Sequence, residues 1–579
     1  MAYRGSGKFI AALKVFARAL ELDPTSWYAQ FSIGDVQREI GLLQPALDTF
    51  RTILEDRPDE LGVKVVLAET ALAAGLEQYR GGLVVRAEES LVEALEVAAG
   101  IIDGGSATRI AWKVAGDAFT AIGKIPEPAS FSKSKEVALR ILAVVEQQAV
   151  DSKIDGMSAV TVSMISPLLA NASSTAIFSA VAILAFKMRV LLETQNEAAI
   201  GSAWFDLAVA ISALRPHLSS LSLSTTADVA LHQAIRAMKF ALHKEPVNAI
   251  FWNALGVLSF DLSPRLAQHC FIKSISYNSR SAVPWTNLGL FYLVHSDEDL
   301  ANQSFLKAQV IDPDWAAAWV GQATLADMAG HAAEASVLLE HAFTLGGTEP
   351  EADIGFATRS FVKYRDEAEA SAPTTGSVKP APAASLSAPL FALTRYLSQR
   401  PDDVAGLHLY ALMLEQVGDL QAASEALEKA GRLLDELYEV DESPDVEGQF
   451  VIAQTNLGRV RLASEDYEGA LGAFDAALSL LDIDAPGASP SACGGGALTK
   501  AQSILLYSEC KLGTALAHFA LGESDAATEV LEAALEDLDS VEGHHGIRRA
   551  NLCVALGRIY FADGDEDRAL GSFMDAPDS

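Results

Sequence analysis

The sequence predicts an all-α protein, an α-solenoid in which antiparallel helix pairs stack into a right-handed superhelix. The chain has 579 residues, which is too long for one compact core. Half of the residues are apolar but only 7% are aromatic, and Ala and Leu dominate. That composition favours closely packed helices over sheets. The strongest indication is one pattern of small and apolar residues that recurs along the chain.

The pattern is most complete between residues 285 and 313. Its positions are Trp285, Leu288, Gly289, Tyr292, Ala301, Phe305, Ala308 and Pro313. We expect Leu288 and Tyr292 to share one face of a first helix, with Phe305 projecting from a second helix into the same seam. The glycine and the two alanines allow helices to cross closely, and Pro313 ends the second helix because it has no N–H to donate. This spacing is that of a tetratricopeptide (TPR) repeat.

The same frame recurs before and after this repeat, although each copy keeps only part of it. The residues predicted to pack these further repeats are Gly34, Ala46, Phe50, Pro58, Trp252, Gly256, Trp319, Gly458, Phe474, Gly557 and Phe573. A single match would be weak evidence. Because many copies keep one frame, the sequence predicts a TPR solenoid whose stacked repeats bury each other's apolar faces.

The spacing also divides the chain into segments. We expect TPR repeats at 1–60 (the first one truncated), 246–350, 390–482 and 500–579, with divergent helical repeats and insertions across 61–245. Two low-complexity segments, 371–389 and 483–499, are expected to be solvated loops. Both ends of the sequence fall inside a repeat, so we expect a segment of a longer protein.

Charge and composition exclude several classes of function. The formal net charge of −33 repels phosphate backbones, so direct nucleic-acid binding is not expected. Four cysteines without a CxxC pair predict neither a metal site nor a cofactor. No nucleophile–base pattern stands out, so the chain is not expected to be an enzyme. The uncharged stretch 157–186 has an apolar part shorter than the roughly 20 residues of a membrane span, and we expect a buried helix there.

Four further segments match one known family beyond the repeat skeleton. They read FWNALGV (251–257), LAQHCFIKSI (266–275), AVPWTNLGLFYL (282–293) and AQVIDPDWAAAWVGQA (308–323). Together they resemble the TPR scaffold subunit of the superkiller (Ski) complex. Segments 111–119 and 556–577 resemble it as well.

The resemblance implies a non-catalytic scaffold that holds a DExH-type RNA helicase and a WD40 propeller subunit. Such a complex feeds mRNA to the cytoplasmic exosome for 3′–5′ decay, so a cytoplasmic location is expected, with an additional nuclear one left open. A generic TPR adaptor or a co-chaperone is the alternative function. A co-chaperone would need Lys and Asn on the first helices, and the expected positions carry apolar or small residues instead: Val283, Thr286, Leu290, Ala317, Val320 and Thr324.

Overall fold

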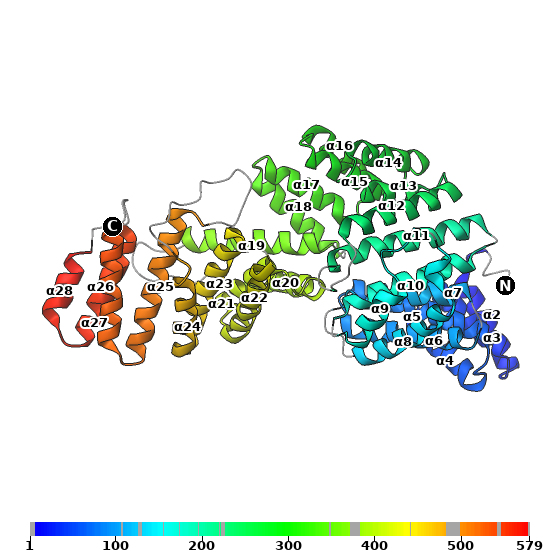
Figure 1. Cartoon of the computed structure of the whole chain (residues 1–579), viewed down its shortest axis with the longest axis horizontal. Helices are drawn as coiled ribbons and strands as arrows, with labels where there is room; N and C mark the ends of the chain where they lie inside the picture. The colour runs from blue at the N-terminus through cyan, green and yellow to red at the C-terminus, as the bar shows by residue number, and fades with distance from the viewer. Residues whose placement is uncertain are drawn as a thin grey trace. The chain divides into compact units, whose positions relative to one another are not determined.

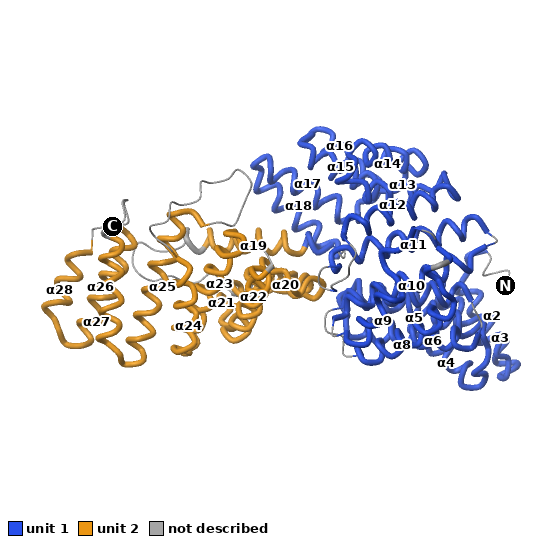
Figure 2. Tube along the Cα trace, in the orientation of Figure 1, with its two compact units in different colours: residues 1–352 blue, residues 353–579 orange. Residues whose placement is uncertain are grey.

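The computed structural model describes residues 6–576 apart from 106–107, 126–129, 155, 173, 195, 219–220, 222–225, 347–348, 371–382, 441, 482–497 and 541–545. Within these ranges the chain is helical and contains no strand, which confirms the predicted all-α solenoid class (Figure 1). It forms two compact units, residues 1–352 and 353–579 (Figure 2).

Unit 1 is a succession of antiparallel helix pairs. Its helices are α2 (Phe9–Leu22), α3 (Trp27–Ile40), α4 (Leu43–Asp56), α5 (Leu61–Arg80), α6 (Val84–Asp103), α7 (Arg109–Ile122), α8 (Phe131–Gln147), α9 (Val162–Ala170), α10 (Ala176–Leu192), α11 (Glu197–Leu214), α12 (Ala227–Lys244), α13 (Ala249–Leu258), α14 (Pro264–Tyr277), α15 (Ala282–Val294), α16 (Glu298–Ile311), α17 (Ala316–Met328) and α18 (Ala332–Thr344). The first helices of the pairs are α3, α5, α7, α11, α13, α15 and α17, and the second helices are α4, α6, α10, α12, α14, α16 and α18.

Unit 2 continues the same construction. It contains most of α19 (Pro350–Ala370), followed by α20 (Ser387–Gln399), α21 (Val404–Val417), α22 (Leu420–Val440), α23 (Pro444–Ala463), α24 (Tyr467–Leu478), α25 (Lys500–Ala520), α26 (Ser524–Ser540), α27 (Gly546–Ala562) and α28 (Glu566–Met574). The pairs are α21–α22, α23–α24, α25–α26 and α27–α28.

Local sequence sets where the helices begin and end. The Asp297 carboxylate accepts the backbone N–H of Leu300 at the start of α16, and Asp466 does the same for Gly469 in α24. Gly41 and Gly418 end α3 and α21 with φ of 89° and 91°, a left-handed conformation that glycine adopts without strain. Short turns therefore bring each second helix back onto the first.

A glycine–phenylalanine contact joins the two helices of a repeat. A Cβ atom built on Gly289 of α15 would lie 2.6 Å from a ring carbon of Phe305 in α16, so only glycine leaves room for the ring. The phenylalanine is also close to the following first helix, because a Cβ on Gly321 of α17 would lie 2.4 Å from the same ring. The fully buried ring of Phe305 is thus held between two consecutive first helices.

The divergent part of unit 1 contains a repeat that is split by two inserted helices. Gly116 of α7 would place a Cβ 2.6 Å from the ring of Phe186 in α10, which is the same contact as in the regular repeats. Sixteen residues separate Gly289 from Phe305, whereas 70 separate Gly116 from Phe186. Helices α8 and α9, which come between α7 and α10 in the sequence, account for the difference. Helix α7 nevertheless packs directly on α10. The apolar stretch that ends at Phe186 forms α10, which is buried from Ala176 to Arg189.

The low-complexity segments lie largely outside the described residues, which begin again at 383 and 498. The end of the first one differs from the prediction, because α20 begins at Ser387 and not after 389. Leu386 is fully buried and Pro389 is buried within the first turn of the helix. Proline is compatible with a first turn, where its missing N–H has no helical partner to lose.

Candidate functional site

The residues predicted to pack the repeats occupy three environments. Buried are Gly34, Ala46, Phe50, Gly256, Leu288, Gly289, Ala301, Phe305, Ala308, Gly458, Phe474 and Gly557; half-buried are Trp252, Trp285, Tyr292 and Trp319; exposed are Pro58, Pro313 and Phe573. The indole N–H groups of Trp252 and Trp319 donate to the carbonyls of Pro246 and Pro313, both at 2.8 Å. The buried side chains among them join helices to one another, so binding surfaces must be sought among the exposed and half-buried residues of the repeats.

One candidate surface lies on the first helices of unit 1. We call it the first-helix face and define it by Ile250 and Val257 of α13 and Val283, Leu290 and Val294 of α15, all of them exposed. Aliphatic side chains exposed in a row are typical of protein-binding surfaces. Two of them, Val283 and Leu290, stand at positions where a co-chaperone is expected to carry Lys or Asn.

One residue assigned to this face from the sequence is buried instead. Thr286 is 2% exposed, and its hydroxyl donates to the Ala282 carbonyl while it accepts the indole N–H of Trp315 at 3.1 Å. Trp315 belongs to the turn before α17, which the repeat spacing alone does not place beside Thr286. The hydroxyl therefore joins two repeats and faces no ligand.

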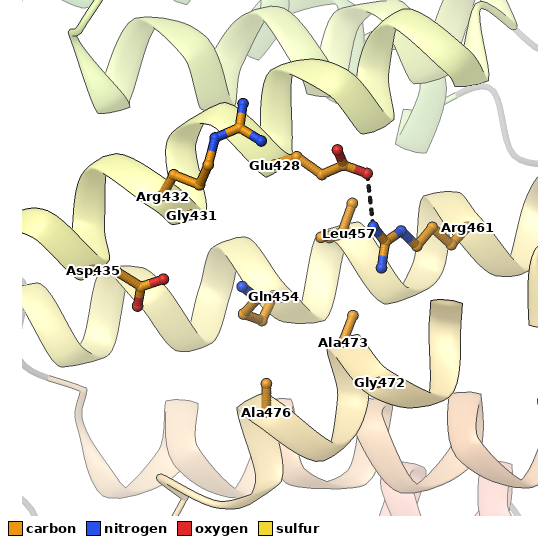
Figure 3. A pocket seen from close by; sticks show the side chains of 10 residues that line it. All are labelled: Glu428, Gly431, Arg432, Asp435, Gln454, Leu457, Arg461, Gly472, Ala473 and Ala476. Carbon is orange, nitrogen blue, oxygen red and sulfur yellow. Dashed lines mark hydrogen bonds and ion pairs between the residues drawn. The ribbon is translucent and has the colours of Figure 1, made fainter. Parts of the chain in front are cut away.

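A second candidate lies in unit 2, between two successive second helices. It is a groove of about 410 Å³ with α22 and α24 as its walls and α23 as its floor. Figure 3 shows the side chains that line it. Its lining residues are Glu428, Gly431, Arg432, Asp435, Gln454, Leu457, Arg461, Gly472, Ala473 and Ala476. The groove exists because its α24 wall carries only glycine and alanine, while polar side chains from α22 and α23 reach into it.

An ion pair crosses this groove. The Arg461 guanidinium donates to the Glu428 carboxylate at 2.7 Å and to the Gly469 carbonyl at 3.0 Å, which joins α23 to both walls (Figure 3). Partial burial, with a smaller effect from nearby Glu439, raises the pKa of Asp435 above its ordinary value. Next to it, Leu434, Tyr438, Val446, Phe450 and Leu480 line an apolar hollow of about 210 Å³ together with Asp435 and Glu447.

Unit 1 has a groove at the same place in the repeat. It measures about 450 Å³ and is lined by Trp285, Leu288, Tyr292, Leu300, Gln303, Ser304, Leu306, Lys307 and Val310. Counted from the repeat glycine and phenylalanine, Trp285, Leu288 and Tyr292 correspond to Gln454, Leu457 and Arg461 of the groove in unit 2. All of its lining residues come from α15 and α16, and we call it the α14–α16 groove because α14 is the second helix that precedes α15. Unlike its counterpart it is apolar, and Lys307 is the one charged residue among those that line it.

Reactive groups in the described residues are buried or paired. Burial raises the pKa of the Cys270 and Cys510 thiols to about 11, so neither forms a thiolate near neutral pH. The imidazole of His408, between α21 and α23, accepts the side-chain N–H of Asn456 at 2.7 Å. No group of three His, Cys, Asp or Glu residues that could hold a metal ion occurs among the described residues.

One described helical stretch, Glu197–His217, is long and apolar enough to span a membrane when judged by length and composition alone. The core helices of soluble proteins pass the same test. Here Asp206, in the middle of the stretch, forms an ion pair with the buried Arg189 of α10.

Comparison with known proteins identifies the class first. The tetratricopeptide repeat family matches residues 1–60. With stacked helix pairs and the glycine–phenylalanine contact in both units, the chain is a tetratricopeptide-repeat protein.

Within that class, its relatives are superkiller 3 proteins. It is 29% identical to superkiller protein 3 of Schizosaccharomyces pombe over 83% of this chain and 33% of the relative. It is 26% identical to superkiller complex protein 3 of Mus musculus over 82% of this chain and 28% of the relative. The resemblance found in the sequence is confirmed. The chain spans about a third of the length of these relatives.

Among solved structures, yeast Tom70 is similar at a TM-score of 0.32 and 15% identity, over 88% of this chain and 94% of Tom70.

Sequence reasoning found the repeat frame but missed the grooves between second helices. The sequence did contain a signal for them, because residues at the same place in the repeat frame differ in character. The floor position is Trp285 in one repeat and Gln454 in another, and the wall position is Lys307 in one and Ala476 in the other. Which positions form a groove, however, depends on which second helices are left uncovered.

Proposed function

We propose that this chain is the non-catalytic scaffold of a superkiller-like complex, in which it holds a DExH-type RNA helicase and a WD40 propeller subunit. The complex delivers mRNA to the cytoplasmic exosome for 3′–5′ decay. The observation that carries the proposal is the similarity to superkiller 3 proteins of fungi and animals across more than four-fifths of the chain.

The physical character of the surface supports a scaffold. Each repeat contacts mainly its neighbours, so the array presents a long surface to its partners. The first-helix face offers aliphatic side chains to a folded partner, and the net charge of −33 favours partners with basic surfaces. On this proposal the RNA is handled by the helicase and not by this acidic chain.

The test is affinity purification of the tagged chain from a cell extract. We expect a DExH-type helicase and a WD40 protein to be recovered in amounts comparable with the bait. A double variant, Val283→Glu with Leu290→Glu, changes two exposed positions of the first-helix face and should reduce recovery without changing thermal unfolding. An exposed pair elsewhere, Ile10→Glu with Val15→Glu on α2, is the matched control.

The outcomes separate the proposal from its alternative. Recovery of Hsp70 or Hsp90 through their C-terminal tails, without helicase or WD40 protein, would support a co-chaperone and contradict the scaffold. Imaging of the tagged chain should show it in the cytoplasm, and a wholly nuclear signal would contradict the proposed place of action.

A further inference from the structure

Helix α8 occupies the groove between two successive second helices, α6 and α10. It packs against both. The backbone N–H of Ser130, at the start of α8, donates to Glu88 of α6 at 2.5 Å, and the guanidinium of Arg140 donates to Asp103 at the end of α6. The ring of Phe131 lies 5.3 Å from that of Phe178 in α10. This inserted helix therefore covers a groove that regular repeats leave open.

The face of α8 that meets the groove is aliphatic. Val137, Ala138, Ile141, Leu142 and Val145 are buried, at the spacing of a single helical face. Ser132, Glu136, Leu139 and Ala143 lie on the opposite, exposed face. The chain thus contains its own example of an amphipathic helix bound between second helices.

The α14–α16 groove has similar residues at the corresponding positions. Trp285 and Tyr292 correspond to Trp112 and Phe119 of α7, counted from the repeat glycine. On the preceding second helix, Ile272 of α14 corresponds to Val92 of α6. At the corresponding positions of the repeat, both sites therefore carry aromatic residues on the first helix and an aliphatic residue on the preceding second helix.

The two grooves differ in how much of their lining is covered by other parts of the chain. Ile272 is 49% exposed while Val92 is 6% exposed. On the other wall, Leu300 is 38% and Leu306 is 44% exposed, while the corresponding Val181 and Lys187 of α10 are 0% and 1% exposed. Lys187 is covered by the segment before α9, where its ammonium group donates to Asp151 at 2.8 Å and to the Val160 carbonyl at 2.6 Å. The side chains that the insertion buries in one repeat are exposed in the other.

We propose that the α14–α16 groove binds an amphipathic helix of a partner protein, in the position that α8 takes between α6 and α10. The helix carries an aliphatic face toward Trp285, Tyr292 and Leu306. Lys307 stands where Met188 is buried in the covered groove, so the bound helix carries an acidic residue beside its aliphatic face.

The groove in unit 2 serves as an internal comparison. Gln454 and Arg461 replace the aromatic residues of the floor, and Glu428 replaces the aliphatic residue of the preceding second helix. The Glu428–Arg461 ion pair is compatible with water and crosses the place where an aliphatic face would bind. An aliphatic helix is therefore expected to prefer the α14–α16 groove to this groove in unit 2.

The probe for this proposal is a peptide with the sequence of residues 131–147, stapled through its exposed positions 139 and 143. One version carries Arg140→Gln, because Asp103, the partner of Arg140 in the covered groove, has no counterpart on α14. A photo-crosslinker on the aliphatic face reports where the peptide binds to the full chain. Fluorescence anisotropy gives its affinity.

We expect crosslinks to α15 and α16, and binding of the Arg140→Gln peptide at least as tight as that of the parent peptide. Leu306→Glu with Val310→Glu should weaken binding about tenfold or more, because two apolar contacts are lost. Both positions are exposed, so unfolding should be unchanged. Ile250→Glu on the first-helix face is the matched control and should leave the affinity unchanged.

Crosslinks confined to the first-helix face, crosslinks to unit 2, or equal affinity for the double variant would each overturn the proposal. The measurement needs no subunit of the superkiller-like complex. Failure of the groove proposal therefore leaves the scaffold proposal standing, and the reverse also holds.

Discussion

The contact between Gly458 and Phe474 gives the sharpest test of how these repeats are built. A Cβ atom at position 458 would lie 2.5 Å from one carbon of the Phe474 ring and 2.7 Å from two others. The ring cannot move toward α25, because a Cβ on Gly513 there would lie 2.3 Å from it. Gly458→Ala therefore forces helices apart, which costs about 1–3 kcal/mol in a packed core.

A matched substitution in the partner helix separates packing from helix propensity. Gly472 lies in the middle of α24, and a Cβ there would meet nothing within 4 Å. Both substitutions gain about 1 kcal/mol of helix propensity. Nothing opposes this gain at position 472, so Gly472→Ala should stabilise the pair α23–α24. Because both variants share the gain, the difference in stability between them is the packing cost.

Hydrogen exchange measured by mass spectrometry reports this difference helix by helix. Amides of α23 and α24 should exchange about 5- to 150-fold faster in Gly458→Ala than in Gly472→Ala, as a difference of 1–3 kcal/mol implies. Adding Phe474→Leu to Gly458→Ala should recover part of the loss, because a smaller side chain relieves the overlap. Equal protection in the two single variants would refute the argument that the glycine is required by the ring.

Three further outcomes follow from buried polar groups and a helix cap. Burial, and then the charge of Arg459, lower the pKa of His408, so the unfolded chain binds more protons below about pH 6.5 and the stability of unit 2 falls as the pH drops from there. In His408→Gln that fall, measured by thermal unfolding between pH 7.5 and 5, should be smaller, and an unchanged slope would contradict it. Asp353→Ala leaves the largely buried Arg395 without its carboxylate and should cost unit 2 about 3–5 kcal/mol in urea unfolding, whereas Asp366→Ala at an exposed pair should cost little. Thr499→Ala removes the capping box with Gln502 and should cost about 1 kcal/mol at the start of α25, seen as faster exchange in its first turn but not in its last.

The repeat frame was visible in the sequence because its physical cause is local. Gly289 and Phe305 lie in consecutive helices joined by a short turn. Their contact therefore requires a fixed spacing of 16 positions along the sequence. The same reasoning missed the pair Gly116 and Phe186, since α8 and α9 are inserted between its helices. Because these two residues are 70 positions apart, the spacing of the regular repeats does not predict their contact.

The burial of Thr286 has a similar explanation. Helical periodicity places it near Val283 and Leu290, which are exposed as expected, but Trp315 from the turn before α17 covers it. A turn that folds back over a neighbouring helix is a tertiary event. Periodicity describes one helix at a time, so it could not exclude Thr286 from the surface.

By itself, the sequence determined the helical class, the pairing of neighbouring helices and the resemblance to superkiller 3 proteins, because all three depend on residues a few turns apart. Only the tertiary structure decided which second helices are covered and which are left as grooves. That outcome depends on whether an inserted helix such as α8 reaches the gap, and on whether the gap is lined by apolar residues or crossed by an ion pair such as Glu428–Arg461. The contacts of α8 with α6 and α10 join residues that are distant along the chain, so no regular spacing in the sequence predicts them.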